Sequence, residues 1–217
     1  MQPGFWHDKW ERRDIGFHQS VPNELLRAHW PALGLKSGER VFVPLAGKSL
    51  DMLWLAGEGL RVLGVELSSL ACEAFFAENG LTPTRREEGA FTRWSCAEIE
   101  LLCGDVFALE SAQLADVQGI YDRAALIALP PEMRRRYVEH LSGALPAAVR
   151  MLLITLDYEQ SERQGPPFAV SADEVRALYA GWDLSCLQTV DLLERDPRYR
   201  ERGLSRISDC AWRVCRS

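Results

Sequence analysis

The sequence lacks both a membrane-spanning segment and a recognisable export signal. No run among its 217 residues approaches the roughly 18 consecutive apolar residues of a membrane helix. The first residues form neither a basic segment nor an apolar signal core. We therefore expect a cytoplasmic protein with no membrane partner.

Paired cysteines are also missing. The six cysteines are scattered along the chain and include no C-x-x-C pair. In a protein without an export signal, this distribution indicates reduced thiols rather than a disulfide framework. The sequence gives no reason to expect a metal site.

Clustered positive charge is scarce, and the formal net charge is −6. A nucleic-acid partner needs grouped Lys and Arg side chains to neutralise its phosphates. The densest basic cluster is the run 134–136, which lies in an expected helix at 132–141. We interpret its three arginines as a solvated helix face, and we expect no nucleic-acid partner.

Alternating strand-like and helix-like segments begin at Arg40 and predict an α/β fold with a mostly parallel, doubly wound sheet. Residues 1–39 form an appended, aromatic-rich helical segment, and residues 40–217 form a Rossmann-like core within a single domain, 1–217. The last two strand-like runs suit an antiparallel hairpin at the sheet edge. Strands are expected at 40–44, 61–65, 90–97, 99–103, 119–122, 149–156, 184–192 and 206–214, and helices after Ser49 and at 69–79, 132–141 and 172–179.

The segment VPLAGKSLDM contains a Gly-Lys-Ser that is typical of phosphate-binding loops. Such a loop needs a second glycine five residues before the Gly-Lys pair, and Phe42 occupies that position. A dinucleotide-binding turn needs three glycines, and here only Gly47 is present. These absences disfavour a nucleoside triphosphatase and an NAD enzyme. We interpret Ser49 as the N-cap of the following helix, and Lys48 has no assigned role.

A tight turn without a phosphate suits S-adenosylmethionine, whose methionine end offers charged groups to backbone atoms. Glu66 ends the second strand 19 residues after Gly47, where doubly wound folds place an acid that binds ribose hydroxyls. That acid fits NAD as well as S-adenosylmethionine. Asp105 follows the next core strand at the same sheet edge and is placed to meet an adenine, although a lone acid there is usually a turn residue.

Arg123 follows the strand expected at 119–122, at the carboxyl edge where open parallel sheets bind ligands. An unpaired arginine in such a place is costly, so its partner is an internal acid such as Asp122 or an anionic group in the cleft.

Four stretches together resemble the thiopurine S-methyltransferase family, particularly its bacterial branch, over nearly the whole chain. They are FWHDKWERRDIGFHQ, FVPLAGKSLDMLWLAGEGLRVLGVELS, IYDRAALIAL and GPPF. The family usually has a cysteine where this sequence has Ala46, which leaves the turn plausible but removes a thiol. The resemblance implies a class I S-adenosylmethionine-dependent methyltransferase fold in which residues 1–39 act as a lid.

The resemblance also implies which residues contact the cofactor, S-adenosylmethionine. Trp6 and Trp10 have the spacing of one helical face that packs on a core, but the family match makes Trp10 a cofactor contact. The implied set, with the turn glycine, is Trp10, Leu45, Gly47, Glu66, Gly104, Asp105, Val106 and Arg123. His18 is interpreted as structural rather than as a base.

For the acceptor, the resemblance implies contacts from Phe17, Pro166, Pro167, Phe168 and a cation from the charged turn 198–202, for which we select Arg200 over Arg202. We assign Arg123 to electrostatic catalysis, with Asp122 as a weaker candidate that orients it or takes a proton. The expected reaction is methyl transfer to an aromatic or heterocyclic thiol such as a 6-thiopurine, or to selenium or tellurium species, by a monomer. Alternatives are a small thiol or halide methyltransferase and a non-catalytic binding module.

Overall fold

One mixed sheet organises the chain. The computed structural model describes residues 3–216, so residues 1 and 2 of the expected lid and residue 217 of the expected core lie outside it. Within 3–216 the sheet has nine strands in the order β3-β4-β5-β2-β1-β6-β7-β9-β8. Its parallel centre consists of β5 (Ile99–Cys103), β2 (Arg61–Glu66), β1 (Arg40–Val43), β6 (Val117–Asp122) and β7 (Val149–Tyr158).

Both edges of the sheet are antiparallel. At one edge, β9 (Ile207–Arg216) pairs with β7 and with β8 (Asp183–Asp191), which confirms the predicted C-terminal hairpin. At the other edge, β5 pairs with β4 (Phe91–Cys96), and β4 pairs with β3 (Thr84–Glu88). The sequence did not predict β3. The doubly wound α/β fold class is confirmed.

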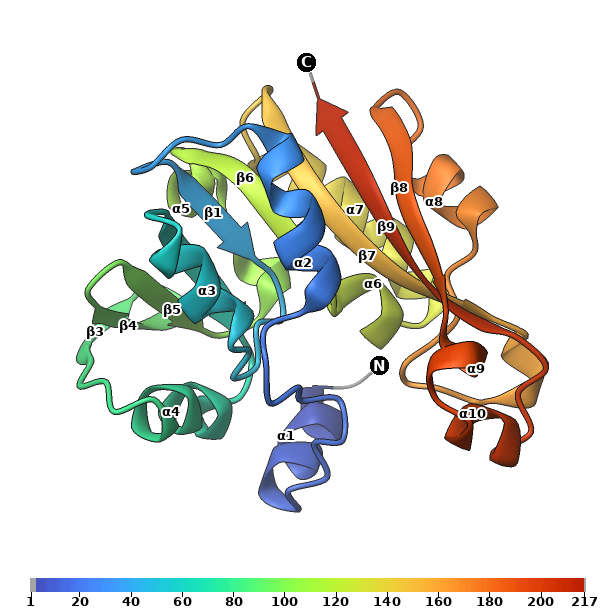
Figure 1. The fold of residues 1–217 in the computed structure, drawn as a ribbon. Helices are drawn as coiled ribbons and strands as arrows, with labels where there is room; N and C mark the ends of the chain where they lie inside the picture. The colour runs from blue at the N-terminus through green and yellow to red at the C-terminus, as the bar shows by residue number, and fades with distance from the viewer. Residues whose placement is uncertain (1–2, 217) are drawn as a thin grey trace.

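Helices cover both faces of the sheet, and an apolar core lies beneath each layer. One layer holds α2 (Glu24–His29), the 3₁₀ turn η1 (Trp30–Leu33), α3 (Asp51–Gly57) and α4 (Ser69–Glu78). The other holds η2 (Val106–Ala108), α5 (Ser111–Leu114), α6 (Ala125–Ala128), α7 (Pro131–Ala144) and α8 (Ala172–Leu178). In Figure 1, α2 and α3 lie in front of the sheet and α7 lies behind it.

Three further helices gather at the end of the sheet toward which the β1 arrow points: α1 (Pro3–Glu11), α9 (Leu192–Arg195) and α10 (Arg198–Glu201) (Figure 1). A last 3₁₀ turn, η3, covers Gln160–Glu162. None of the helices found in 3–216 is both long enough and apolar enough to cross a membrane.

The first residues of α3 differ from the expected helix start. The helix begins at Asp51 with Leu50 at the N-cap position, so the assignment of Ser49 as N-cap is wrong. The Ser49 hydroxyl still accepts the backbone N–H of Asp51, at 3.2 Å. The helix therefore starts one residue later than the sequence pattern indicates, because the turn after β1 extends through Ser49, whose N–H donates to the Ala46 carbonyl at 3.1 Å.

The basic run on α7 is not uniformly solvated, and that interpretation is wrong for Arg134. Its side chain is fully buried, and Nε donates to the carbonyl oxygens of Leu126 and Leu129, at 3.0 and 2.9 Å. Nη1 donates to both carboxylate oxygens of Glu174 on α8, at 2.6 and 2.7 Å. Arg135 and Arg136 are exposed. Arg134 therefore ties α7 to α6 and α8.

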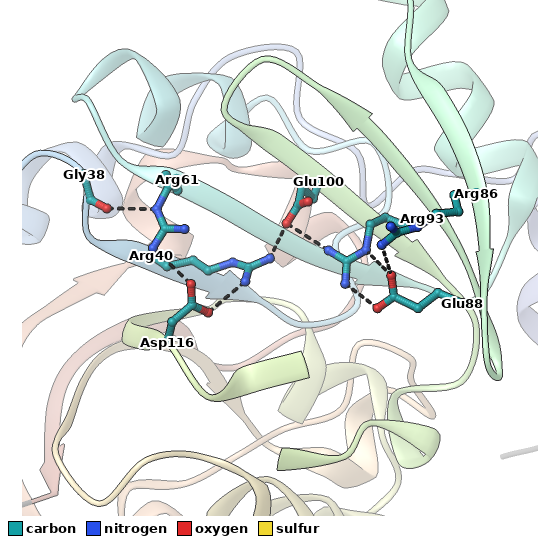
Figure 2. Close-up of polar contacts among 8 residues, drawn as sticks. All are labelled: Gly38, Arg40, Arg61, Arg86, Glu88, Arg93, Glu100 and Asp116. Carbon is teal, nitrogen blue, oxygen red and sulfur yellow. Dashed lines mark hydrogen bonds and ion pairs between the residues drawn. The ribbon is translucent and has the colours of Figure 1, made fainter. Parts of the chain in front are cut away.

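A chain of ion pairs crosses the strands next to the β3 edge (Figure 2). Glu100 on β5 pairs with Arg40 of β1 and with Arg93 of β4, the latter at 2.9 Å. Arg93 continues the chain to Glu88 on β3, at 2.6 Å. At the other end, Arg40 donates to Asp116, at 2.7 Å. Paired guanidinium groups hold the pKa of Glu88 at about 2, with Arg93 the main cause.

Candidate active site

A cavity of about 970 Å³ opens at the carboxyl ends of the central strands. Its walls come from the turn after β1, the ends of β2 and β6, the η2 turn, and the N-terminal segment. Ligand pockets in proteins usually measure about 300 to 1,000 Å³. This cavity is therefore large enough for a nucleoside-sized cofactor and a small acceptor side by side, at the edge where parallel sheets bind ligands.

The turn after β1 has an unusual backbone. Leu45 and Gly47 both have positive φ, at 46° and 54°, a region that non-glycine residues rarely adopt. The Ala46 N–H donates to the Val65 carbonyl at 2.9 Å, which fastens the turn to β2. A Cβ atom at Gly47 would lie 3.4 Å from the indole of Trp10. That distance is an ordinary van der Waals contact, so the glycine is required by the backbone conformation rather than by the packing of α1.

Glu66 lies at the end of β2, and its carboxylate is 7% exposed. Oε2 accepts the Gly47 N–H at 2.8 Å, and Oε1 accepts the Ser68 N–H at 2.7 Å. Burial raises the pKa of Glu66, and the backbone donors oppose that rise. Each oxygen can accept a further hydrogen bond, so the residue is placed to bind two neighbouring hydroxyls. The sequence identified it correctly as a cavity residue.

The turn after β5 forms the adjoining wall, with Gly104, Asp105 and Val106 all lining the cavity. The Gly104 N–H donates to the Glu66 carbonyl at 2.9 Å. Asp105 caps η2, because Oδ1 accepts the Phe107 N–H at 2.9 Å. Asp105 therefore acts as a turn cap and also lines the cavity, two roles that the sequence left as alternatives.

Aromatic side chains from the N-terminal segment cover one side of the cavity. Trp10 is 8% exposed, and its ring meets Phe17 edge-on with centroids 5.8 Å apart. Phe17 makes the same type of contact with Trp6, also at 5.8 Å. Phe17 itself is 44% exposed. The i, i+4 tryptophans of α1 therefore share a partner and face the cavity.

Arg123 enters the cavity from the end of β6, but its partner was not foreseen. Nε of Arg123 donates to Oδ2 of Asp51 at 3.1 Å, and the same oxygen accepts the Tyr121 hydroxyl at 2.9 Å. Oδ1 of Asp51 accepts the Asn23 N–H at 2.7 Å. Asp51 is 2% exposed. One buried carboxylate thus joins α3, the end of β6 and the N-cap residue of α2.

The interpretation of Asp122 as the group that orients Arg123 is wrong. Its Oδ2 accepts the Tyr137 hydroxyl at 2.8 Å, and Oδ1 accepts the Ala125 N–H at 3.1 Å. Asp122 is 1% exposed and lies away from the residues that line the large cavity. Burial raises its pKa to about 6. Because β6 alternates its side chains, Asp122 faces the α7 layer while its neighbour Arg123 faces the ligand side.

The opposite end of the cavity is lined by Arg163, Pro166, Pro167, Leu192, Tyr199, Arg202 and Asp209. Two predicted acceptor residues are absent from this wall. Phe168 packs toward the Arg134 guanidinium, 6.0 Å from the ring centroid, and the cavity-lining arginine of the charged turn is Arg202 rather than Arg200. Arg200 lies within α10 whereas Arg202 follows the helix as its C-cap residue, so the two side chains point in different directions.

Lys48 and His18 also line the cavity. Nζ of Lys48 donates to both carboxylate oxygens of Glu78 on α4, at 2.7 Å each, so its role is a structural ion pair. Burial lowers the pKa of His18, and the Lys48 charge lowers it further. The imidazole therefore favours its neutral form.

Sequence reasoning missed Asp51, Tyr121, Arg163 and Asp209. The sequence holds one signal for Asp51, which is a carboxylate in a helix that is otherwise apolar. Such a group needs hydrogen-bond partners when the helix is buried. For the other three, the pattern along the chain does not show which strand or loop faces the cavity.

Comparison with known proteins adds to this geometry. A family model described as "Thiopurine S-methyltransferase (TPMT)" matches residues 1–217. A relative named thiopurine S-methyltransferase from Pseudomonas entomophila (strain L48) is 54% identical over 216 residues, which cover 100% of both chains. The protein of the same name from Bordetella parapertussis (strain 12822) is 49% identical over 215 residues, which cover 99% of this chain and 98% of the relative.

Among solved structures, a similar fold occurs in the Burkholderia thailandensis 1,6-didemethyltoxoflavin-N1-methyltransferase with bound 1,6-didemethyltoxoflavin and S-adenosylhomocysteine. The TM-score is 0.65 at 15% identity, and the match covers 99% of this chain and 87% of that one. At this identity the likeness concerns the fold, which is the one used by class I methyltransferases.

Proposed function

Because the chain belongs to the thiopurine S-methyltransferase family, we propose that it transfers the methyl group of S-adenosylmethionine to the sulfur of an aromatic or heterocyclic thiol such as a 6-thiopurine. The observation that carries the proposal is the cavity that contains both Glu66 and Arg123. One supplies a buried carboxylate for a ribose, and the other supplies a cation that lines the same space.

The residues at the Glu66 end fit S-adenosylmethionine. The carboxylate keeps free acceptor positions beyond its two backbone donors, and the Leu45–Gly47 turn offers backbone groups to the methionine end of the cofactor. Gly104, Asp105 and Val106 border the adenine, and Trp10 covers the bound molecule. When bound, S-adenosylmethionine supplies a methyl group on a positively charged sulfonium.

The acceptor occupies the end lined by Phe17, Pro166 and Pro167, with Arg123 and Arg202 nearby. Their positive charge stabilises a thiolate, because an adjacent cation favours the anionic form of an acid. The pair with Asp51 uses Nε of Arg123, so its terminal nitrogens are not consumed by that contact. The protein's main contributions are alignment of sulfur with the methyl group and a preorganised electrostatic environment.

Selenium and tellurium nucleophiles belong to the same proposal, because they are soft like sulfur and would meet the same aligned methyl group. We also propose that the protein acts as a monomer in the cytoplasm. The six free cysteines suit a reducing compartment.

Calorimetry and a transfer assay test the proposal. We expect S-adenosylmethionine to bind the wild-type protein, and Glu66→Ala to weaken binding about tenfold to a hundredfold, since a hydrogen bond to a charged group contributes about 1.5–3 kcal/mol. Glu73→Ala, on the exposed face of α4, is the matched control and should bind normally. Unchanged binding by Glu66→Ala would reject the ribose assignment.

The transfer assay uses labelled cofactor with a 6-thiopurine, an aryl thiol, a small aliphatic thiol, a halide ion, selenite and tellurite. Label in the thiopurine sulfur supports the proposed activity. Label that appears only with a small aliphatic thiol or a halide ion would move the chain to the alternative reaction on this fold. Cofactor binding without transfer to any acceptor would favour the non-catalytic binding module.

A further inference from the structure

Asp209 is a carboxylate in the wall of the cavity that the reaction scheme above leaves unused. It lies on β9, where it pairs with Leu156 of β7 on one side and Val190 of β8 on the other. Two strands therefore fix its backbone. Its neighbour Cys210 belongs to the core on the α7 side of the sheet, so alternation along the strand turns Asp209 to the opposite, cavity side.

The Asp209 carboxylate has no hydrogen bond or ion pair with any other residue in 3–216. By contrast, the buried carboxylates of Glu66, Asp51 and Asp122 each accept at least two hydrogen bonds. Asp209 is half-buried, and a carboxylate that loses part of its water without gaining a donor is destabilised. A ligand bound in the cavity would supply such a donor.

Charged groups face Asp209 from several elements. Arg123 approaches from the end of β6 and Arg195 from α9, and both oppose the effect of burial, which raises the Asp209 pKa to about 6. Arg202 and Tyr199 line the same end of the cavity. On β7, Asp157 is engaged by Arg206 at 3.1 Å. Asp209 therefore titrates between a carboxylate and a neutral acid close to physiological pH.

The other acidic side chains of the cavity wall already have hydrogen-bond or ion-pair partners within the protein. Asp14 pairs with Lys9 of the lid, and Glu66 is held by two backbone donors at the ribose end. Asp105 caps η2 on the adenine side. Among the described lining residues, Asp209 is thus the carboxylate without a hydrogen-bond partner in the protein, and the charges of Arg123 and Arg195 act on it.

Heterocyclic thiols such as 6-thiopurines exist largely as thiones with a ring N–H next to the C=S group. Methylation of the sulfur then requires loss of that ring proton. We propose that Asp209 accepts the hydrogen bond of the ring N–H and takes its proton during methyl transfer. The inference rests on the proposed function and specifies its acceptor class: a heterocyclic thione with an N–H beside the sulfur-bearing carbon.

The step balances without another reagent. A sulfur lone pair of the acceptor forms the new S–CH₃ bond, and the S–CH₃ bond of the donor breaks with its electron pair left on the donor sulfur. The ring N–H bond breaks and its electron pair forms a C=N bond in the ring, while the π pair of the C=S bond moves onto sulfur as a lone pair and the proton moves to Asp209. One positive sulfonium and one negative carboxylate become neutral together, which a poorly solvated cavity favours.

The test compares two acceptors in wild type and Asp209→Asn: 6-mercaptopurine, which carries the ring N–H, and 5-thio-2-nitrobenzoate, an acidic aryl thiol without one. General base catalysis contributes about 100-fold or more, so kcat with 6-mercaptopurine should fall by about that factor. Turnover of the aryl thiol should stay within about twofold. The wild-type kcat for 6-mercaptopurine should also increase with pH through about 6, and the variant should lose that increase.

Asp183→Asn, an exposed position on β8 that pairs with Arg213, is the matched control and should behave as wild type. Calorimetric binding of S-adenosylmethionine by Asp209→Asn verifies its fold, and Asp209→Glu should recover part of the lost kcat. An equal loss with both acceptors, or no loss with 6-mercaptopurine, would overturn the proposal. If the wild-type enzyme methylates the aryl thiol but not 6-mercaptopurine, the role of Asp209 is overturned and the proposed thiol methylation stands. If the wild-type enzyme methylates neither acceptor, the role of Asp209 and the proposed function are both rejected.

Discussion

Arg123 and Asp51 form a mostly buried ion pair, with Nε 3.1 Å from Oδ2 and side chains that are 19% and 2% exposed. The contact joins the loop after β6 to the first turn of α3. The same carboxylate also accepts the Asn23 N–H. The position of Arg123 in the cavity therefore depends on Asp51, which itself is held in place by Asn23. Disturbing Asp51 should therefore affect stability and turnover together.

Asp51→Asn should lower the free energy of unfolding by about 1–3 kcal/mol, because it leaves a partly buried guanidinium without its counter-charge. It should also lower kcat through a less constrained Arg123. Tyr121→Phe removes one hydroxyl from the same oxygen and should cost about 1 kcal/mol with a smaller effect on kcat. Denaturant unfolding and steady-state kinetics measure both. Equal kinetic losses in the two variants would contradict a specific role for the ion pair.

Arg123→Ala should reduce kcat for a 6-thiopurine by about 100-fold, the usual loss when one preorganised electrostatic group is removed. Asp122→Asn should reduce it far less, because Asp122 bonds Tyr137 and Ala125 on the other face of β6. Single-turnover measurements with saturating cofactor make the comparison. A larger loss in Asp122→Asn would place the chemistry at that carboxylate.

Arg202→Ala should increase the KM for the thiol acceptor about tenfold, since a charge-assisted contact of about 1.5 kcal/mol would be lost. Arg200→Ala is the matched control, because Arg200 lies two residues away in the last turn of α10 but outside the cavity wall. Its KM should equal that of wild type. A larger effect at Arg200 would restore the assignment made from the sequence.

Asp209→Asn should stabilise the free protein at pH 7 by about 1–3 kcal/mol. The pKa of Asp209 rises from 3.8 to about 6 on folding, so the folded state binds a proton more tightly than the unfolded state. This group therefore makes the wild type lose stability as pH increases from about 4 to about 6. Denaturant unfolding from pH 4 to 8 should show that the variant lacks this loss, and parallel curves for both proteins would contradict it.

Much of the fold and half of the site follow from local patterns. The turn at Leu45–Gly47 and the acid Glu66 are separated by one helix and one strand, so their spacing along the chain already places them together. Asp105 follows by the same rule. These residues depend on connections between neighbouring elements of a parallel sheet, which sequence periodicity describes well.

The missed features depend on contacts between distant segments. Burial of Arg134 requires Glu174, which lies on another helix, and its neighbours in the sequence look solvated. The strand β3 has a polar sequence that no apolar alternation marks, and its pairing with β4 defines it. Asp209 becomes a cavity residue only through the register of β9 between β7 and β8.

The strand β3 (TRREE) also lies at the outer edge of the sheet. An open edge strand exposes unpaired backbone groups that can recruit the strand of another molecule and start aggregation. Here the exposed edge carries closely spaced charges, and Glu88 is tied inward by Arg93. An approaching strand would have to desolvate those charges before pairing. The charges on β3 thus oppose extension of the nine-stranded sheet by another molecule at this edge.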